Sequence, residues 1–151
     1  MALITLGANS GKGKVLQVVR TYVANSSQIT TTSTSDAPSG IQASITPTAS
    51  GNLILVDYVS TMTDSGVDCH AIMYQKIGSA SIVPMASASH FHVGYTDVSQ
   101  TRYAPFTFSG SYTTTSTDTL LYEPYIKVSS GTGWLVHANS SYALTLTEVE
   151  Q

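Results

Sequence analysis

The sequence predicts an all-β fold, a single-domain antiparallel β-sandwich of the jelly-roll-like kind. Helical periodicity is almost absent from the chain. Gly, Pro and clusters of Ser, Thr and Asn interrupt it at intervals of about 8–15 residues, which is typical of short strands joined by turns. Ser (22) and Thr (21) supply 43 of the 151 residues, whereas Asp, Glu, Lys and Arg supply only 10%. Hydroxyls on β-branched residues suit pleated surfaces and close subunit contacts, where charges would repel or lose their hydration.

The length favours one domain. A chain of 151 residues buries about 70% of the surface that its unfolded form exposes, so it needs no disulfide or metal to fold. We expect an N-terminal arm over residues 1–13 and a sandwich over residues 14–151. Because Cys69 is the single cysteine, the chain forms no internal disulfide, and Cys69 is expected to be a small buried residue.

The arm is predicted from its composition. An apolar stretch at residues 2–6 precedes a glycine-rich hinge at residues 7–13, and neither reads as a core strand. Three of the six basic residues, Lys12, Lys14 and Arg20, lie in the first twenty positions, which contain no acidic residue. We expect this segment to become ordered on a partner.

The first predicted strands follow the arm directly. Residues 15–23 alternate, with Val15 on one face and Val18 on the other. Residues 28–35 form a threonine-rich strand with little to bury. Residues 52–61 are apolar on both faces, so this strand should be central in its sheet.

Further strands complete the sandwich. They are expected at residues 41–46, 67–75, 81–85, 89–95, 103–108, 120–128, 133–138 and 142–149, with turns at 64–66, 77–79, 109–110 and 130–133. Pro105 and Pro124 fall within strand-like segments, so those strands are expected to be edges or to carry bulges. The final strand ends close to the last residue and should be held inside a sheet.

Charge and hydropathy argue against two classes of partner. The net charge is −3, without the broad basic surface that nucleic-acid binding needs. No stretch approaches the roughly 18–20 apolar residues of a membrane span, and the N-terminus lacks the pattern of a signal peptide. We therefore expect neither nucleic acid nor membrane as a partner.

The motif content also argues against an enzyme. The chain has no G-x-S-x-G elbow, no phosphate loop and no dinucleotide fingerprint. Paired carboxylates would be needed to cleave a polysaccharide, but there are only nine acidic residues and most lie at predicted turns. Asp57 and Glu123 are exceptions that fall within predicted strands. We expect no catalytic residues and no cofactor.

One short pattern contains residues that could bind a metal ion. In a strand, His90 and His92 would point to the same side, and three copies around a threefold axis would present six imidazoles to an octahedral metal. The alternative, which we favour, is that they line a polar sheet face or a subunit contact. His70 and His137 are expected to be ordinary hydrogen-bonded polar residues.

The aromatic residues are mostly tyrosine, with nine Tyr against three Phe and one Trp. Tyrosine combines apolar area with a hydroxyl and is enriched where proteins meet proteins or sugars. Its β propensity explains the same count, so the tyrosines alone do not identify a binding site.

Several segments together resemble a small β module of tailed-phage virion proteins, of the cyanophage and marine-phage type. Residues 13–19 (GKVLQVV) are similar to its opening, and a Ser/Thr-rich strand follows at 26–35. Residues 41–47 (IQASITP) and 52–56 (NLILV) come next in the same order as in the module. Residues 143–149 (ALTLTEV) are similar to its closing strand. The resemblance covers residues 13–151.

The resemblance implies a trimeric β-sandwich in a virion. Such modules form the tips of fibre or tail proteins, but a module preceded by a short arm looks more like a capsid decoration (cement) protein. We therefore expect a homotrimer on the capsid surface, bound to the major capsid protein. The expected contact residues of the arm are Leu3, Ile4 and Leu6, which would dock on the shell, and Lys12 and Lys14, which would meet shell carboxylates. The alternative is a receptor- or glycan-binding tip on the tail, with a host glycan as partner.

Overall fold

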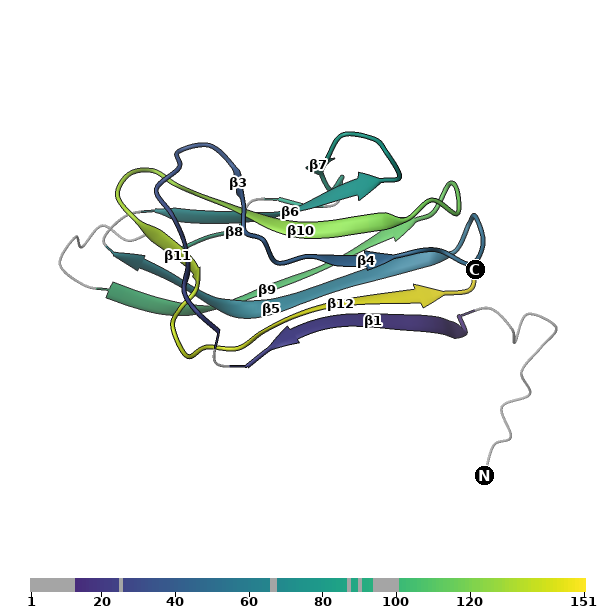
Figure 1. Cartoon of the computed structure of the whole chain (residues 1–151), viewed down its shortest axis with the longest axis horizontal. Coiled ribbons are helices and arrows are strands. Elements are labelled where there is room, and N and C mark those ends of the chain that lie inside the picture. The colour runs from purple at the N-terminus through teal and green to yellow at the C-terminus, as the bar shows by residue number, and fades with distance from the viewer. Residues whose placement is uncertain (1–12, 25, 66–67, 87, 90, 94–100) are drawn as a thin grey trace, which may run out of the picture.

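The protein is a two-layered β-sandwich. The computed structural model describes residues 13–24, 26–65, 68–86, 88–89, 91–93 and 101–151, and these form twelve strands. The strands build two antiparallel sheets that face one another (Figure 1). The antiparallel β-sandwich predicted from the sequence is therefore confirmed. None of the described residues belongs to a helix with the length and apolarity needed to cross a membrane.

Sheet A is built around one long strand. Its strands are β1 (Val15–Val23), β2 (Ile29–Thr31), β5 (Leu53–Ser65), β9 (Thr101–Thr113), β11 (Gly133–Val136) and β12 (Tyr142–Val149). Strand β5 pairs with β12 and β11 along one edge and with β9 along the other. The expectation that the strand beginning near residue 52 is central is confirmed.

Sheet B is built around the pair of β6 and β10. Its strands are β3 (Ala37–Pro38), β4 (Ala43–Ile45), β6 (Cys69–Ile77), β7 (Val83–Pro84), β8 (Phe91–Val93) and β10 (Leu120–Val128). Strand β10 pairs with β6 along one edge and with β4 and β3 along the other. The remaining edge of β6 pairs with β7 and β8.

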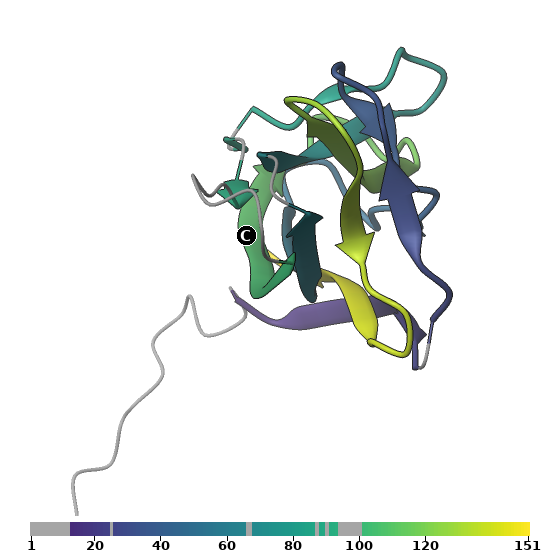
Figure 2. The ribbon, with the colours of Figure 1, turned by 90° about the vertical axis from the view of Figure 1, so that its left-hand side faces the viewer.

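The chain winds between the layers as in a jelly roll. In sheet A the main order is β1-β12-β5-β9, so the first and last strands lie side by side. In sheet B, β3 and β4 lie beside β10, β10 beside β6, and β6 beside β7 and β8. Each sheet thus pairs strands that are distant in sequence, as double-sheet jelly rolls do. Figure 2 shows β11 and β2 rising along one side of the sandwich, out of the layer that contains β1 and β12.

The longest ladder corrects two predicted turns. Strands β5 and β9 pair residue for residue over 13 positions, with Leu53 opposite Thr113 and Ser65 opposite Thr101. Residues 64–65 and 109–110 therefore lie inside strands. The continuous partner strand forms hydrogen bonds with the backbone N–H and C=O groups of these residues. These hydrogen bonds outweigh the local turn preference of a Ser-Gly pair.

The two prolines behave differently. Pro105 lies in β9, which has no strand partner on its outer edge among the described residues, so the edge prediction is confirmed there. Pro124 lies in β10, which is central and not an edge. On the side away from β6, β10 pairs with β4 up to Tyr122 and with β3 from Tyr125 onwards. Pro124 falls in the gap between the two, where its missing N–H breaks no ladder bond on that side.

The core fills the space between the layers. Its largest fully buried side chains are Tyr58, Tyr122, Phe106, Ile41, Ile45, Ile54, Met62, Met73, Leu120, Ile126, Leu135 and Leu144. Cys69 is also fully buried, as predicted for a small core residue. Gly133 of β11 packs so closely on it that an added Cβ would lie 2.6 Å from both Cys69 Sγ and Val128 Cγ1. The sandwich is therefore closed at this side by a glycine that has room for no side chain.

Candidate functional site

The structure describes only some of the candidate contact and metal-binding residues predicted from the sequence. Those outside the described residues are Leu3, Ile4, Leu6, Lys12 and His90. Lys14 is described: it is exposed, immediately precedes β1, and accepts the backbone N–H of Glu150 at 2.9 Å through its carbonyl oxygen. The arm thus joins the sandwich at the end where the C-terminal strand finishes. The backbone of His92 lies opposite His70 in the β6–β8 ladder, and its side chain is outside the description.

The expectation that His137 is an ordinary hydrogen-bonded polar residue is confirmed. Its ring meets the ring of Tyr103 edge to face, with centroids 4.9 Å apart. Its Nδ1 lies 3.2 Å from the carbonyl oxygen of Ala138. Within the part of the chain that the structure describes, no three His, Cys, Asp or Glu side chains come together in a way that could hold a metal ion.

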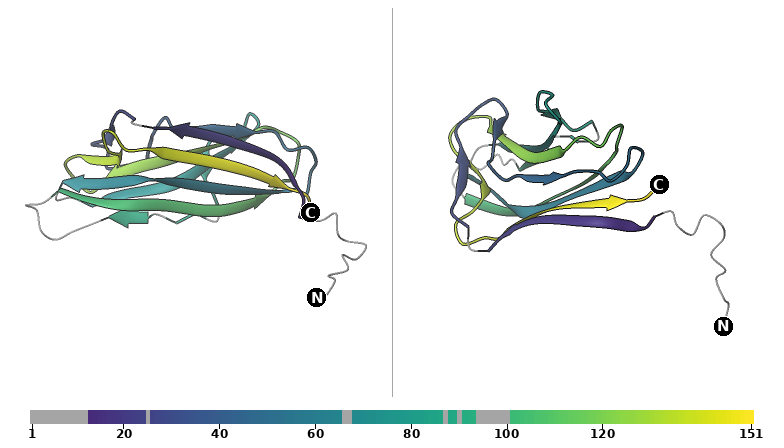
Figure 3. Two further views of the ribbon diagram at one scale, coloured as in Figure 1. Left: turned by 90° about the horizontal axis from the view of Figure 1, so that it is seen from below. Right: turned by 45° about the vertical axis from the view of Figure 1, so that its right-hand side comes forward.

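The first candidate surface is the outer face of sheet A, here called the A face. It consists of the side chains of β1, β12, β5 and β9 that point away from the core, and Figure 3 (left) shows these four strands side by side. Because β12 runs between β1 and β5, each outward residue of β12 has a neighbour on both sides. The rows are Val15–Val149–Leu53, Val18–Thr147–Leu55, Arg20–Thr145–Asp57 and Tyr22–Ala143–Val59.

The A face is apolar and poor in charge. Val15, Val18, Tyr22 and Val59 have exposed fractions between 48% and 58%. Val15 and Val18 lie on one side of the Arg20–Thr145–Asp57 row, and Tyr22 and Val59 lie on the other. Exposed apolar side chains grouped on one sheet face mark sites of contact with other proteins. Strand β9 extends the face with a margin of hydroxyls, because Thr107, Ser109, Ser111 and Thr113 all point outward.

Only one cation and one anion lie in the four rows, Arg20 and Asp57. The guanidinium of Arg20 lies 5.0 Å from the ring centroid of Tyr22 on its own strand. Asp57 accepts a hydrogen bond of 2.7 Å from the hydroxyl of Ser109. Both charges are exposed and remain open to a further partner.

Sequence reasoning missed the A face because of a bulge. The β1–β12 register shifts between Val15 and Gln17, so Leu16 is an extra residue. Val15 and Val18 therefore share the outer face, whereas strict alternation placed them on opposite faces. On β5 the signal was present, since the outward residues from Leu53 to Val59 alternate with buried ones.

A buried carboxylate holds the strands beneath the A face. Glu148 of β12 points inward and is fully buried. It accepts hydrogen bonds from Gln17 Nε2 and Asn52 Nδ2, both at 2.6 Å, and from the backbone N–H and hydroxyl of Thr48 at 2.7 and 2.8 Å. Burial alone raises the pKa of Glu148, but the hydrogen bonds from Asn52, Gln17 and Thr48 hold it below its ordinary value. The ionised carboxylate thus ties β1 and the turn before β5 to β12.

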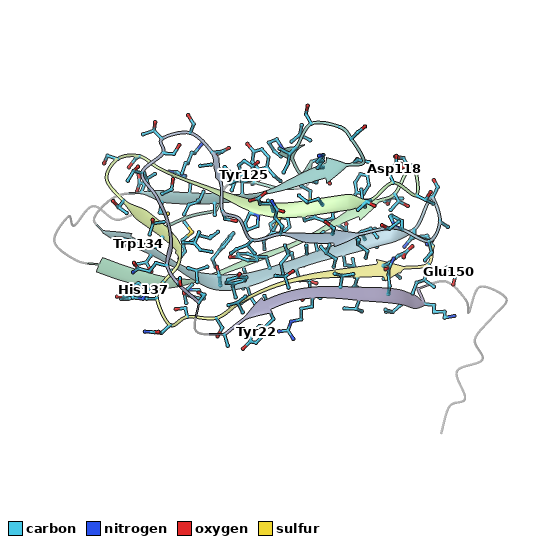
Figure 4. The ribbon with its side chains drawn as sticks, viewed as in Figure 1. Tyr22, Asp118, Tyr125, Trp134, His137 and Glu150 are labelled. Atoms are coloured by element: carbon cyan, nitrogen blue, oxygen red, sulfur yellow. The ribbon has the colours of Figure 1, made fainter. Side chains whose placement is uncertain are left out.

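The second candidate surface is an open groove of about 580 Å³ on the outer face of sheet B, here called the B groove. Its lining residues are Pro38, Gln42, Lys76, Ser79, Ala80, Ser81, Ile82, Leu121, Glu123 and Tyr125. Figure 4 shows Tyr125 on the opposite outer side of the sandwich from Tyr22 of the A face. The groove and the A face are therefore separate surfaces.

The aromatic side of the B groove is rigidly held. The rings of Tyr125 and Tyr74 stack at a centroid distance of 3.9 Å. The hydroxyl of Tyr74 donates to Asp36 at 3.0 Å, and Lys127 lies 3.5 Å from the same carboxylate. Burial and the neighbouring Asp36 carboxylate raise the pKa of Tyr74 to about 12, so this hydroxyl stays protonated and keeps donating.

Glu123, at the edge of the B groove, has a structural role in this arrangement. Its carboxylate accepts the backbone N–H of Gly40 and the Nε2 of Gln42, both at 2.8 Å, and it is 2% exposed. Asp57, the other carboxylate named above from the predicted strands, lies on the A face. The two carboxylates thus lie on opposite sheets of the sandwich.

Comparison with known proteins gives a likeness of fold. No protein-family model matches the chain, and no curated protein sequence matches it. Among solved structures, the fold is similar to a chain in the structure of infectious bursal disease virus, Gx strain. The TM-score is 0.44 and the sequence identity is 14%, and the likeness covers 99% of this chain and 41% of the viral chain.

Proposed function

We propose that this protein is a structural protein of a tailed-phage virion, a capsid decoration protein that binds where major capsid subunits meet. In this proposal its copies form trimers, as the resemblance to the phage module implies, and it has neither catalytic residues nor a cofactor. Double-sheet jelly rolls recur in viral capsid domains and in lectins. Fold alone does not choose between those two classes, so the proposal rests on surface chemistry.

The observation that carries the proposal is the composition of the A face. It exposes Val15, Val18, Tyr22 and Val59 while presenting one cation and one anion in its rows. Covering such a face removes apolar area from water, at about 25 cal/mol per Å², and requires little desolvation of charge. A face with these properties suits close packing against other subunits.

The arm supplies the contact with the shell in this proposal. Leu3, Ile4 and Leu6 provide apolar anchors, and Lys12 and Lys14 provide charges for shell carboxylates. Lys14 is exposed where the arm leaves the sandwich, so the arm can reach a neighbouring surface without disturbing the sheets. The sandwich would then be held on the shell by this N-terminal segment.

A binding experiment tests the arm. Shells assembled from the major capsid protein encoded in the same genome are mixed with the full chain or with a variant lacking residues 1–12, and bound protein is measured by cosedimentation. The full chain is expected to bind saturably, and the truncated protein is expected to fold normally but not to bind. Undiminished binding by the truncated protein would refute the role of the arm. Failure of the full chain to bind any shell would refute the decoration function.

The B groove favours a second candidate function, a glycan-binding tip. Its lining combines one side of the Tyr74–Tyr125 stack with Lys76, Gln42 and the hydroxyls of the loop at residues 79–82. Aromatic and polar groups held together in a groove are the chemistry that orients a bound sugar. Binding of the isolated protein to a host surface glycan, lost in Tyr125→Ala, would favour this function over decoration.

A further inference from the structure

We propose that the A face binds the A face of a second copy of this chain, related by a two-fold axis that runs along β12. This self-association goes beyond the proposed function, since neither the resemblance nor the arm requires it. It rests on the registers of β1, β12 and β5, which give the A face a composition that is complementary to itself.

The geometry follows from the central position of β12. A two-fold axis parallel to β12, lying between two facing sheets, exchanges left and right but keeps each row at its own height. It therefore places β1 of one copy over β5 of the other, and β12 over β12. Aligned packing of two sheets about 10 Å apart is the common arrangement for facing β-sheets.

Every row is complementary under this operation. Arg20 of each copy faces Asp57 of the other, which gives two opposite-charge contacts. Val15 faces Leu53, Val18 faces Leu55 and Tyr22 faces Val59, so that apolar side chains meet apolar ones. Thr145 and Thr147, on the axis, face their own copies, which brings hydroxyl against hydroxyl. An axis perpendicular to β12 that crosses the Arg20–Thr145–Asp57 row would instead place Arg20 over Arg20 and Asp57 over Asp57, and this repulsion favours the first orientation.

The size of the contact sets its strength. Three strands about 4.8 Å apart, each contributing about 27 Å of length, present roughly 400 Å² of sheet on each copy, or about 800 Å² in all. Specific stable interfaces bury about 1,200–2,000 Å², so the isolated pair should be weak, with a dissociation constant in the micromolar to millimolar range. The contact would become strong where copies are already held side by side on a shell, because tethering raises their effective concentration.

The two-fold contact is compatible with the proposed trimer only where the threefold contact uses other surfaces of the sandwich. The A face would then join a subunit of one trimer to a subunit of the next. Both in the isolated pair and between two trimers, the contact joins two chains, with β12 of one chain facing β12 of the other.

A charge exchange tests the pairing. Arg20→Glu and Asp57→Arg each create two like-charge contacts in a homodimer, so each variant alone should weaken self-association about tenfold or more in sedimentation measurements. An equimolar mixture of the two variants restores both opposite-charge contacts, and so does the double variant R20E/D57R. Recovery in both cases is the expected result. Self-association that is unchanged in the single variants, or that stays lost in the mixture and the double variant, would overturn the proposal.

Cross-linking tests the axis directly. In Thr145→Cys, the new thiol lies on the axis and should be joined to its own copy by a short bifunctional maleimide. Thr107→Cys, exposed on β9, is the matched control and should give no two-chain product, because it lies away from the axis. The native Cys69 is fully buried and should not react in the folded protein. Equal cross-linking of the two variants would contradict the assigned axis.

Discussion

Two buried carboxylates, Glu123 and Glu148, connect loops to the strands that carry the two outer surfaces. Glu148 holds the turn before β5 and strand β1 under the A face, through Thr48, Asn52 and Gln17. Glu123 holds the loop beside the B groove through Gly40 and Gln42. In a chain with so few charges, each of these side chains has its oxygens occupied by protein donors. Their role follows from burial and is structural.

We predict that Glu148→Gln lowers the free energy of unfolding by about 2–3 kcal/mol, because an amide cannot accept all the donors that surround the carboxylate and hydrogen bonds to a charged group are the stronger ones. Urea unfolding at neutral pH measures the change. Glu150→Gln removes the same charge at the partly exposed end of the chain and should change stability by less than about 0.5 kcal/mol. An equal effect of the two variants would contradict the role assigned to Glu148.

The same carboxylate predicts acid sensitivity. The folded-state pKa of Glu148 lies below its ordinary value of 4.5, so its contribution is fully present above that pH and is lost as the pH falls through the folded-state pKa. Stability should therefore decline below about pH 4.5 in the native protein and less steeply in Glu148→Gln. Unfolding curves collected between pH 3 and pH 7 test this, and parallel declines of the two proteins would refute it.

Gly133 is predicted to tolerate no side chain. A Cβ at this position would lie 2.6 Å from Cys69 Sγ and from Val128 Cγ1, so Gly133→Ala should destabilise the protein by about 1–3 kcal/mol. Removing the sulfur in Cys69→Ala should relieve part of the clash, so the double variant should lose less stability than the two single losses added together. Thermal unfolding of the four proteins measures this coupling, and strict additivity would contradict the close contact.

Among the secondary-structure elements, β10 shows how a proline is accommodated in a central strand. The adjacent strand is split into β3 and β4, and the loop between them passes beside Pro124, whose carbonyl oxygen accepts the N–H of Ser39 at 3.2 Å. The same loop supplies the donors to Glu123 and part of the wall of the B groove. The proline, the split strand and the groove therefore form one local arrangement.

We predict that Gly40→Ala disturbs this element. Gly40 has φ +79°, a left-handed conformation that costs a residue with a Cβ about 1–2 kcal/mol, and its N–H donates to Glu123. Thermal unfolding should show this loss of stability. The control is Ser44→Ala on the exposed side of β4, where less than about 0.5 kcal/mol is expected. Wild-type stability in Gly40→Ala would mean that the loop can rearrange without cost.

The sequence predicts elements well where their pattern is local. The bounds of β1, β10 and β12 agree with the predicted ones because each is an apolar alternation between clear turn residues. The extent of β9 was not predictable, since residues 109–110 have turn preferences and are held extended only by β5, far away in sequence. The face assignment in β1 failed at Leu16, because a bulge is a property of the pairing of two strands.

The whole molecule combines a rigid sandwich with two separate surfaces. Residues 1–12 of the arm lie outside the described residues, and the arm stays a prediction. The A face and the B groove could not be predicted, because each is assembled from several strands whose neighbours are distant in sequence. The sequence could predict only the composition of these surfaces, which is rich in hydroxyl groups and tyrosine and poor in charge.

In the proposed function, many copies of this protein coat a phage shell. A reconstruction of the purified particle, at a resolution sufficient to place a protein of 151 residues, tests this proposal. We predict density for the sandwich repeated over the outer surface of the capsid, at the positions where major capsid subunits meet. Density confined to the tip of the tail, or a particle without this protein, would contradict it.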